Sequence, residues 1–268
     1  EVHADFCPVH ILSLGAKTAI APLVTNRSCE QKEQLGIVME RYKETLDDNV
    51  DIRSFASAID VFEKIREAGG LSVLCHIYWD AINFDNKTRM GAPEQLINAL
   101  VKCCKFDAFE ITSGAPPTDT KANYLQETYY REMLPRNFPI IGITDSHSTD
   151  RHMGTIFGTN YTIAFVSEFS EKGIIDAIRD YKTVSVDAVT GEIKCHGSLR
   201  LCKYAAFLIE EYFPMHDEIV SIEGLYMERL LLAKETSFGQ LDALCKSSSS
   251  ILMDEWKEIL PMKNNKQL

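Results

Sequence analysis

An apolar run that ends in metal-ligand residues constrains this chain more than any other feature. Residues 140–143 read Ile-Ile-Gly-Ile, typical of a short buried strand, and Asp145 and His147 follow directly. In parallel α/β folds the carboxyl ends of strands carry the chemistry. Asp145 and His147 there offer a carboxylate oxygen and an imidazole nitrogen, both of which bind divalent metals. The alternative is an ordinary turn, in which Asp, Ser and His are common.

The first 190 residues alternate between strand-like and helix-like segments. Short apolar runs predict strands at residues 71–75, 106–112, 139–144, 161–166 and 183–187. Amphipathic spacing predicts helices at residues 29–46, 55–68, 93–104, 119–134 and around 174–178. Such alternation is typical of an α/β domain with a parallel sheet or barrel.

The character of the sequence changes near Gly191. Helical patterns dominate from about residue 198, and the serine run at residues 247–250 predicts a linker before a last short helix. We therefore expect two parts, a hydrolase-like domain of residues 1–190 and a helical C-terminal extension of residues 191–268.

Composition narrows the partners and the compartment. The 268 residues carry a formal net charge of -11, which disfavours binding to extended nucleic acid. No run approaches the ~18 apolar residues that cross a bilayer, and no secretory signal is recognisable. The eight cysteines include no Cys-x-x-Cys pair, which indicates reduced thiols rather than a zinc finger or a disulfide framework. We expect a cytoplasmic protein that binds no membrane.

Three of the predicted strands end in or contain possible metal ligands. His76 follows the strand at 71–75, Glu110 lies in the strand at 106–112, and Asp145 and His147 follow the strand at 139–144. Because parallel strands direct their carboxyl ends to one edge, these side chains are expected to share a site. Taken alone, His76 is equally explained as a hydrogen-bonded core histidine. Taken alone, a carboxylate such as Glu110 is more often a turn residue or a support of a ligand than a ligand itself.

These segments together resemble a known family. Glu1, His10-Ile-Leu-Ser-Leu-Gly15, Val73-Leu-Cys-His76-Ile-Tyr-Trp79, Phe109-Glu-Ile-Thr112 and Gly142-Ile-Thr-Asp-Ser-His147 resemble, in order, the later motifs of the PHP (polymerase and histidinol phosphatase) domain. The resemblance is greatest to stand-alone PHP metal-dependent phosphoesterases and covers residues 1–190. It implies a distorted (β/α)7 barrel of the α/β class, followed here by the helical extension.

The resemblance also implies a set of metal ligands. Glu1 would bridge two ions, His10 and His76 would bind one of them, and Asp145 and His147 would reach the others. Two or three divalent ions (Mn, Fe or Zn) are expected, with a metal-bridging hydroxide as the nucleophile. Glu110 corresponds to a position that supports the ligands without binding metal.

The sequence departs from the family pattern in two places. Ile77 follows the histidine where the family usually has proline. The early His-x-His and Asp-His motifs are absent, which makes the barrel N-terminally incomplete as written and predicts that the chain is a fragment. If those motifs are truly missing, the chain alone would lack part of its metal cluster.

The expected function is hydrolysis of a phosphate mono- or diester, on a small phosphorylated substrate such as a nucleotide. Arg151 and His152 lie near enough in sequence to reach a bound phosphate, although a solvated loop charge is the commoner explanation of such residues. Two alternatives remain: an amidohydrolase-like metal hydrolase, and a non-catalytic PHP-like interaction module. Three further histidines have no spacing that recommends them and are assigned structural roles: His3, His196 and His216.

Overall fold

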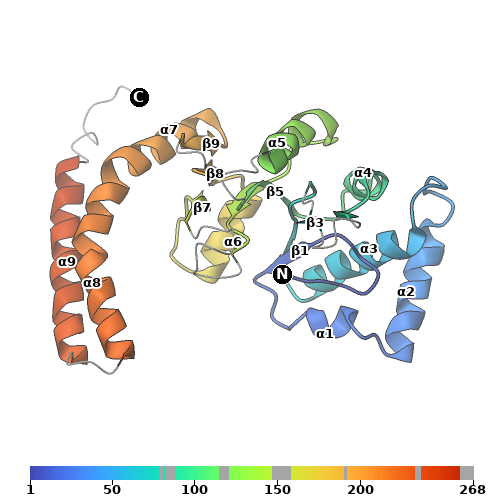
Figure 1. Cartoon of the computed structure of the whole chain (residues 1–268), viewed down its shortest axis with the longest axis horizontal. Coiled ribbons are helices and arrows are strands. Elements are labelled where there is room, and N and C mark those ends of the chain that lie inside the picture. The colour runs from blue at the N-terminus through green and yellow to red at the C-terminus, as the bar shows by residue number, and fades with distance from the viewer. Residues whose placement is uncertain are drawn as a thin grey trace. The chain divides into compact units, whose positions relative to one another are not determined.

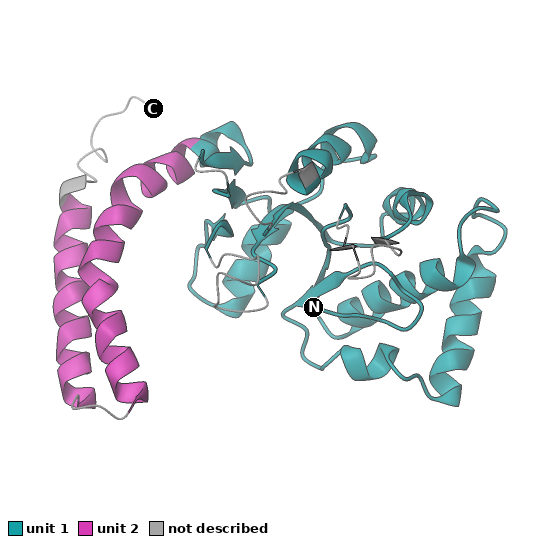
Figure 2. Cartoon of the chain, viewed as in Figure 1, with its two compact units in different colours: residues 1–202 teal, residues 203–268 magenta. Residues whose placement is uncertain are grey.

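The computed structural model describes residues 1–78, 81–82, 89–114, 121–146, 158–189, 192–232 and 237–259 (Figure 1). It divides into two compact units, residues 1–202 and residues 203–268 (Figure 2). Helix α7 (Leu199–Phe207) runs across the boundary between the two units.

A four-stranded sheet lies at the centre of the first unit. Its strands are β1 (Ile11–Leu14), β2 (Leu71–Leu74), β5 (Ala108–Ser113) and β6 (Ile140–Ile143), in the order β1-β2-β5-β6. β2, β5 and β6 are parallel, as the strand–helix alternation predicts, and β1 pairs antiparallel with β2. The α/β class is therefore confirmed.

Along the described part of the chain, five helices lie between these strands in sequence: α1 (Ala21–Val24), α2 (Cys29–Tyr42), α3 (Ile52–Glu67), α4 (Glu94–Cys103) and α5 (Lys121–Met133). Helix α3 makes a large contribution to the core, because residues 55–62 and Ile65 are buried. The Asp51 carboxylate caps its start by accepting from Ser54 N at 2.9 Å. Gly69 ends it at φ +78°, a backbone conformation that favours glycine.

The remaining strands of the first unit differ from the predicted parallel pattern. β7 (Asn160–Ala164), β8 (Thr183–Asp187) and β9 (Lys194–His196) form a separate antiparallel sheet, with α6 (Glu171–Arg179) between β7 and β8 in sequence. A short pair, β3 (Ala81–Ile82) and β4 (Arg89–Met90), forms a third sheet. The described residues therefore show no closed barrel.

Side-chain hydrogen bonds, rather than a backbone ladder, join the two larger sheets. Thr162 Oγ1 donates to Gly142 O at 2.8 Å, and Thr183 Oγ1 donates to Ile140 O at the same distance. Gly142 leaves room for this contact, because a Cβ there would lie 2.4 Å from Ser185 Oγ. The antiparallel sheet thus packs along β6 without extending its ladder within the described part of the chain.

The second unit is a pair of long helices. α8 (Phe213–Leu231) follows a short π-helix, η2 (Leu208–Tyr212), and packs beside α9 (Phe238–Ile259) (Figure 1). The linker predicted at residues 247–250 is wrong, because these serines lie inside α9 and Ser248 is buried. The free-energy cost of serine in a helix is small and is outweighed when neighbouring side chains pack, so the serine run does not interrupt α9. No helix among the described residues has the length and apolarity to cross a membrane.

Candidate metal centre

The direction of β1 brings the start of the chain to the edge of the sheet where the parallel strands end. Ile11 pairs with Leu74 in the antiparallel ladder, and the amide of Cys75 donates to His10 O at 3.2 Å. The amide of Val2 donates to Ile11 O at 2.8 Å, which places Glu1 beside the same edge. Residues 66 positions apart, His10 and His76, therefore become neighbours.

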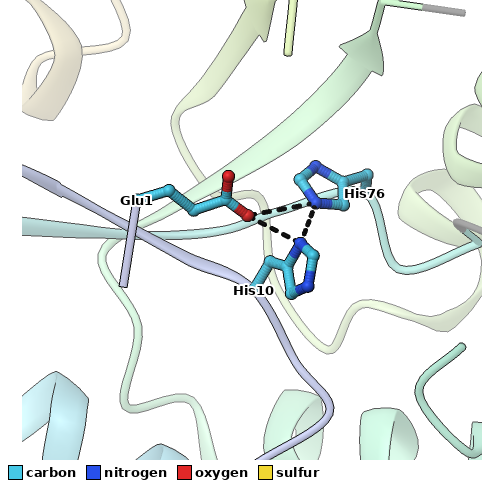
Figure 3. Close-up of side chains that lie close together, drawn as sticks. All are labelled: Glu1, His10 and His76. Atoms are coloured by element: carbon cyan, nitrogen blue, oxygen red, sulfur yellow. Dashed lines mark hydrogen bonds and ion pairs between the residues drawn. The ribbon is translucent and has the colours of Figure 1, made fainter. Parts of the chain in front are cut away.

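Three ligand-type atoms converge at this edge (Figure 3). Glu1 Oε1 lies 2.6 Å from His10 Nδ1 and 3.4 Å from His76 Nε2, and the two ring nitrogens are 2.6 Å apart. Two lone pairs that face each other at such a distance repel unless a proton or a metal lies between them. Three donor atoms directed at one point are the arrangement expected of a cation site.

Glu110 fixes the orientation of the His76 ring from behind. Its Oε2 atom accepts from the backbone amide of His76 at 3.0 Å and lies 3.1 Å from His76 Nδ1. Since an ionised carboxylate can only accept, Nδ1 carries a proton and Nε2 faces the cluster. A carboxylate behind a histidine is the usual support of a metal-ligating imidazole.

The charges around this cluster favour a cation. Burial raises the pKa of the Glu1 carboxyl, but hydrogen bonds and charges from His10 and His76 outweigh it and hold that pKa well below its ordinary value. Burial lowers the pKa of His76, but hydrogen bonds to Glu1 and Glu110, together with the charges of Glu110 and Asp145, raise it to about 10. A proton and a metal ion would therefore compete for the same nitrogen.

The donor set fits a divalent ion. Imidazole and carboxylate ligands suit Zn, Mn and Fe. A tetrahedral site with bonds of about 2.0–2.1 Å separates its ligand atoms by roughly 3.3 Å, so the Glu1–His76 separation already matches, and His10 Nδ1 is about 0.7 Å too close to both. Binding an ion with this geometry would require His10 Nδ1 to move by about that distance.

A second carboxyl-edge feature is the turn that follows β6. Asp145 is partly buried with φ +48°, and its charge contributes to the raised pKa of His76. A Cβ on Gly114 would overlap Thr144 O, so the ends of β5 and β6 touch through their backbones and fix this turn. His147, the other predicted ligand of this turn, lies outside the described residues, as do Arg151 and His152.

A buried ion pair holds the N-terminal segment in place. Arg27 is 3% exposed, and its guanidinium donates to Asp60 Oδ2 at 3.1 Å and to Asp5 O at 3.2 Å. The amide of Arg27 donates to Asp5 Oδ2 at 3.2 Å. Through Asp5, this network anchors the segment that carries Glu1 and His10.

The structure also places residues to which sequence analysis gave other roles or none. His3 lies beside the cluster, with Nε2 3.6 Å from Glu1 Oε1 and its ring centroid 4.2 Å from that of His10. Its position in an irregular segment left no periodic signal from which to predict this.

Cys75 precedes His76, and burial followed by the charge of Glu110 raises the pKa of its thiol well above the ordinary value. In the absence of a metal its thiol is therefore held in the protonated form at neutral pH. His196 lies in β9 and His216 in α8.

Comparison with known proteins gives little support beyond this geometry. No family model matches the chain, and no curated protein matches it. One solved structure is similar, that of a two-domain protein from Bacteroides vulgatus containing a predicted PHP-like metal-dependent phosphoesterase. The two share 13% identity with a TM-score of 0.27, over 70% of this chain and 67% of the other. At that TM-score the likeness carries no conclusion about fold or function.

Proposed function

We propose that this chain is a metal-dependent phosphoesterase that hydrolyses a phosphate mono- or diester of a small molecule such as a nucleotide. The convergence of Glu1, His10 and His76, with Glu110 behind His76, carries the proposal. The sequence resemblance to PHP phosphoesterases directs it toward phosphate esters rather than other substrates. The site lies at the carboxyl edge of parallel strands, where α/β enzymes place their chemistry.

In this proposal Glu1, His10 and His76 hold one ion, and Asp145 and His147 reach one or two more. Bound divalent ions would supply Lewis acidity toward a phosphoryl oxygen and a water nucleophile near neutral pH. The residues themselves act as ligands and supports. Glu110 keeps Nε2 of His76 directed at the cluster, and the charges of Glu1 and Asp145 offset those of the cations.

The proposal is tested by metal content and hydrolysis together. The purified chain is loaded with Mn²⁺, Fe²⁺ or Zn²⁺, its bound metal is measured by mass spectrometry, and hydrolysis of p-nitrophenyl phosphate and bis(p-nitrophenyl) phosphate is followed. His76→Ala is expected to abolish both metal binding and hydrolysis. His216→Ala, a histidine in the second unit, is the matched control and is expected to leave both unchanged.

Three results would contradict the proposal. A chain that binds no metal would favour a non-catalytic interaction module. Metal-dependent hydrolysis of amides or lactones, without phosphoesterase activity, would favour an amidohydrolase-like enzyme. Phosphoesterase activity that survives His76→Ala would place the reaction elsewhere in the molecule.

A further inference from the structure

One face of α8 and the residue that follows it carries a regular repeat. The side chains recur at alternating spacings of three and four residues, the pattern of a helix seam that packs on another helix: Met215, Glu218, Ile222, Leu225, Arg229 and Leu232. Over 17 residues this stripe extends for about 26 Å along the helix.

This stripe differs from the face that packs on α9. The inner contacts of the pair join Tyr212 to Trp256, with ring centroids 4.7 Å apart, and Glu223 to Cys245. Ile222 is rotated about 100° from Glu223, so the stripe points to the side of the pair. Accordingly Ile222 is 49% exposed, Leu225 58% and Leu232 55%. Three large apolar side chains at a regular spacing are thus left exposed by the described residues of the second unit.

The order of residues along the stripe is self-complementary. If two copies of α8 pack antiparallel about a point between Glu223 and Gly224, Ile222 of one copy meets Leu225 of the other. The same register places Met215 against Leu232, and the negative Glu218 against the positive Arg229. A parallel arrangement would instead place Glu218 against Glu218 and Arg229 against Arg229, which is repulsive.

We infer that this stripe is the contact by which two copies of the chain associate, with their α8 helices antiparallel. A two-fold axis makes each contact occur twice, so every apolar pair and every ion pair is doubled. The occupant is a second copy because the charges and the apolar residues both match under one register. No other partner is needed to explain that symmetry.

The size of the stripe sets the expected strength. The six side chains, of which Met215 is only partly exposed, offer on the order of 500 Å² per copy, below the ~800 Å² of a standard specific interface. The dimer is therefore expected to dissociate in the micromolar range, roughly 1–100 µM. It would be missed in dilute samples.

The test is sedimentation equilibrium of the whole chain across that concentration range, with charge-swap variants. Glu218→Arg alone sets Arg against Arg229, and Arg229→Glu alone sets Glu against Glu218. Each is expected to weaken self-association roughly tenfold or more. A mixture of the two variants restores both opposite-charge pairs, and is expected to form a heterodimer within about threefold of the wild-type affinity.

Leu225→Lys probes the apolar part of the contact and is expected to leave the chain monomeric. Its matched control is Leu231→Lys, which changes a more exposed leucine (87%) on another face of α8 and is expected to leave the dimer intact. Circular dichroism of each variant checks that helix content is kept, and the restored heterodimer shows independently that both swapped chains fold.

The inference is overturned if the wild-type chain stays monomeric throughout the concentration range. Binding of a different protein to the stripe would not rescue it, because the inferred partner is a second copy of the chain. It is equally overturned if the mixed variants fail to restore association, or if Leu231→Lys weakens the dimer as much as Leu225→Lys. These outcomes do not depend on metal binding or hydrolysis, so they are separate from the proposed function.

Discussion

Replacing Glu110 with glutamine removes the charge behind His76 and keeps the size of the side chain. The carboxylate is fully buried, accepts from the His76 amide at 3.0 Å and lies 3.1 Å from Nδ1. Loss of such a support typically weakens metal binding 10- to 100-fold, about 1.4–2.7 kcal/mol. The glutamine oxygen can keep both contacts with His76, which leaves its NH₂ group at the position of Oε1, a buried atom without a hydrogen-bond partner; an unpaired buried polar group costs about 1–3 kcal/mol of folding free energy.

A second effect of the same substitution acts in the opposite direction. Glu110 helps raise the pKa of His76 to about 10. Its removal lowers that pKa, so a proton competes less strongly with the metal for His76 at neutral pH. Titrations at several pH values separate the two effects, because proton competition fades as the pH approaches 10. The measured loss of metal affinity should therefore be largest at the high-pH end of the series, where weaker proton competition no longer offsets it.

Metal affinity is measured by competition with a chromophoric chelator, and stability of the metal-free chain by thermal unfolding. Glu110→Gln is expected to lower the midpoint of unfolding by about 3–10 °C. Glu67→Gln, an exposed carboxylate at the end of α3, is the matched control and should change neither quantity. An affinity within twofold of the wild type at every pH would refute the role assigned to Glu110.

Two further predictions concern the fold. Arg27→Met removes the buried partner of Asp60 and leaves the partly exposed contact with Lys64 at 3.3 Å, so it is expected to lower the free energy of unfolding in urea by about 3 kcal/mol. Arg41→Met breaks a more exposed pair with Glu63 and should lower it by under about 1 kcal/mol. Equal costs would contradict this ranking. Burial lowers the pKa of His196 despite the charge of Glu127, so the folded state binds a proton less readily than the unfolded state. The stability that His196 contributes is thus expected to be full above pH ~6.5 and to be lost as the pH falls through its lowered pKa. His196→Gln should flatten that dependence and His216→Gln should not; identical curves for the two variants would contradict the assignment.

Local patterns in the sequence predicted elements better than they predicted pairings. The apolar spacing of Ile59, Phe62 and Ile65 identifies α3, and Gly69 marks its end, because both signals act within a few residues. The serines at 247–250 misled, since burial of Ser248 against the neighbouring helix outweighs a weak local preference. The antiparallel pairing of β7 with β8 had no local signal, because strand direction depends on tertiary packing.

The candidate site shows the same limit. Convergence of parallel strand ends predicted His76 near Asp145, and the family resemblance added Glu1 and His10, which the structure brings together with His76. Their role as metal ligands stays a prediction. The proximity of His3 was missed, because it follows from a bridge between Val2 and Ile11 that no periodic pattern reveals.

The antiparallel course of β1 also has a consequence for how the chain resists unfolding. An ion held jointly by His10 and His76 would act as a cross-link that closes a loop of 66 residues. Closing a long loop removes conformational freedom from the unfolded chain, so a bound metal would stabilise the folded state. Because the first strand could detach only after the ion had lost one of its ligands, metal loading would also oppose the release of that strand. The segment of residues 1–14 would then be the part of the molecule whose susceptibility to proteases depends most on the metal supply.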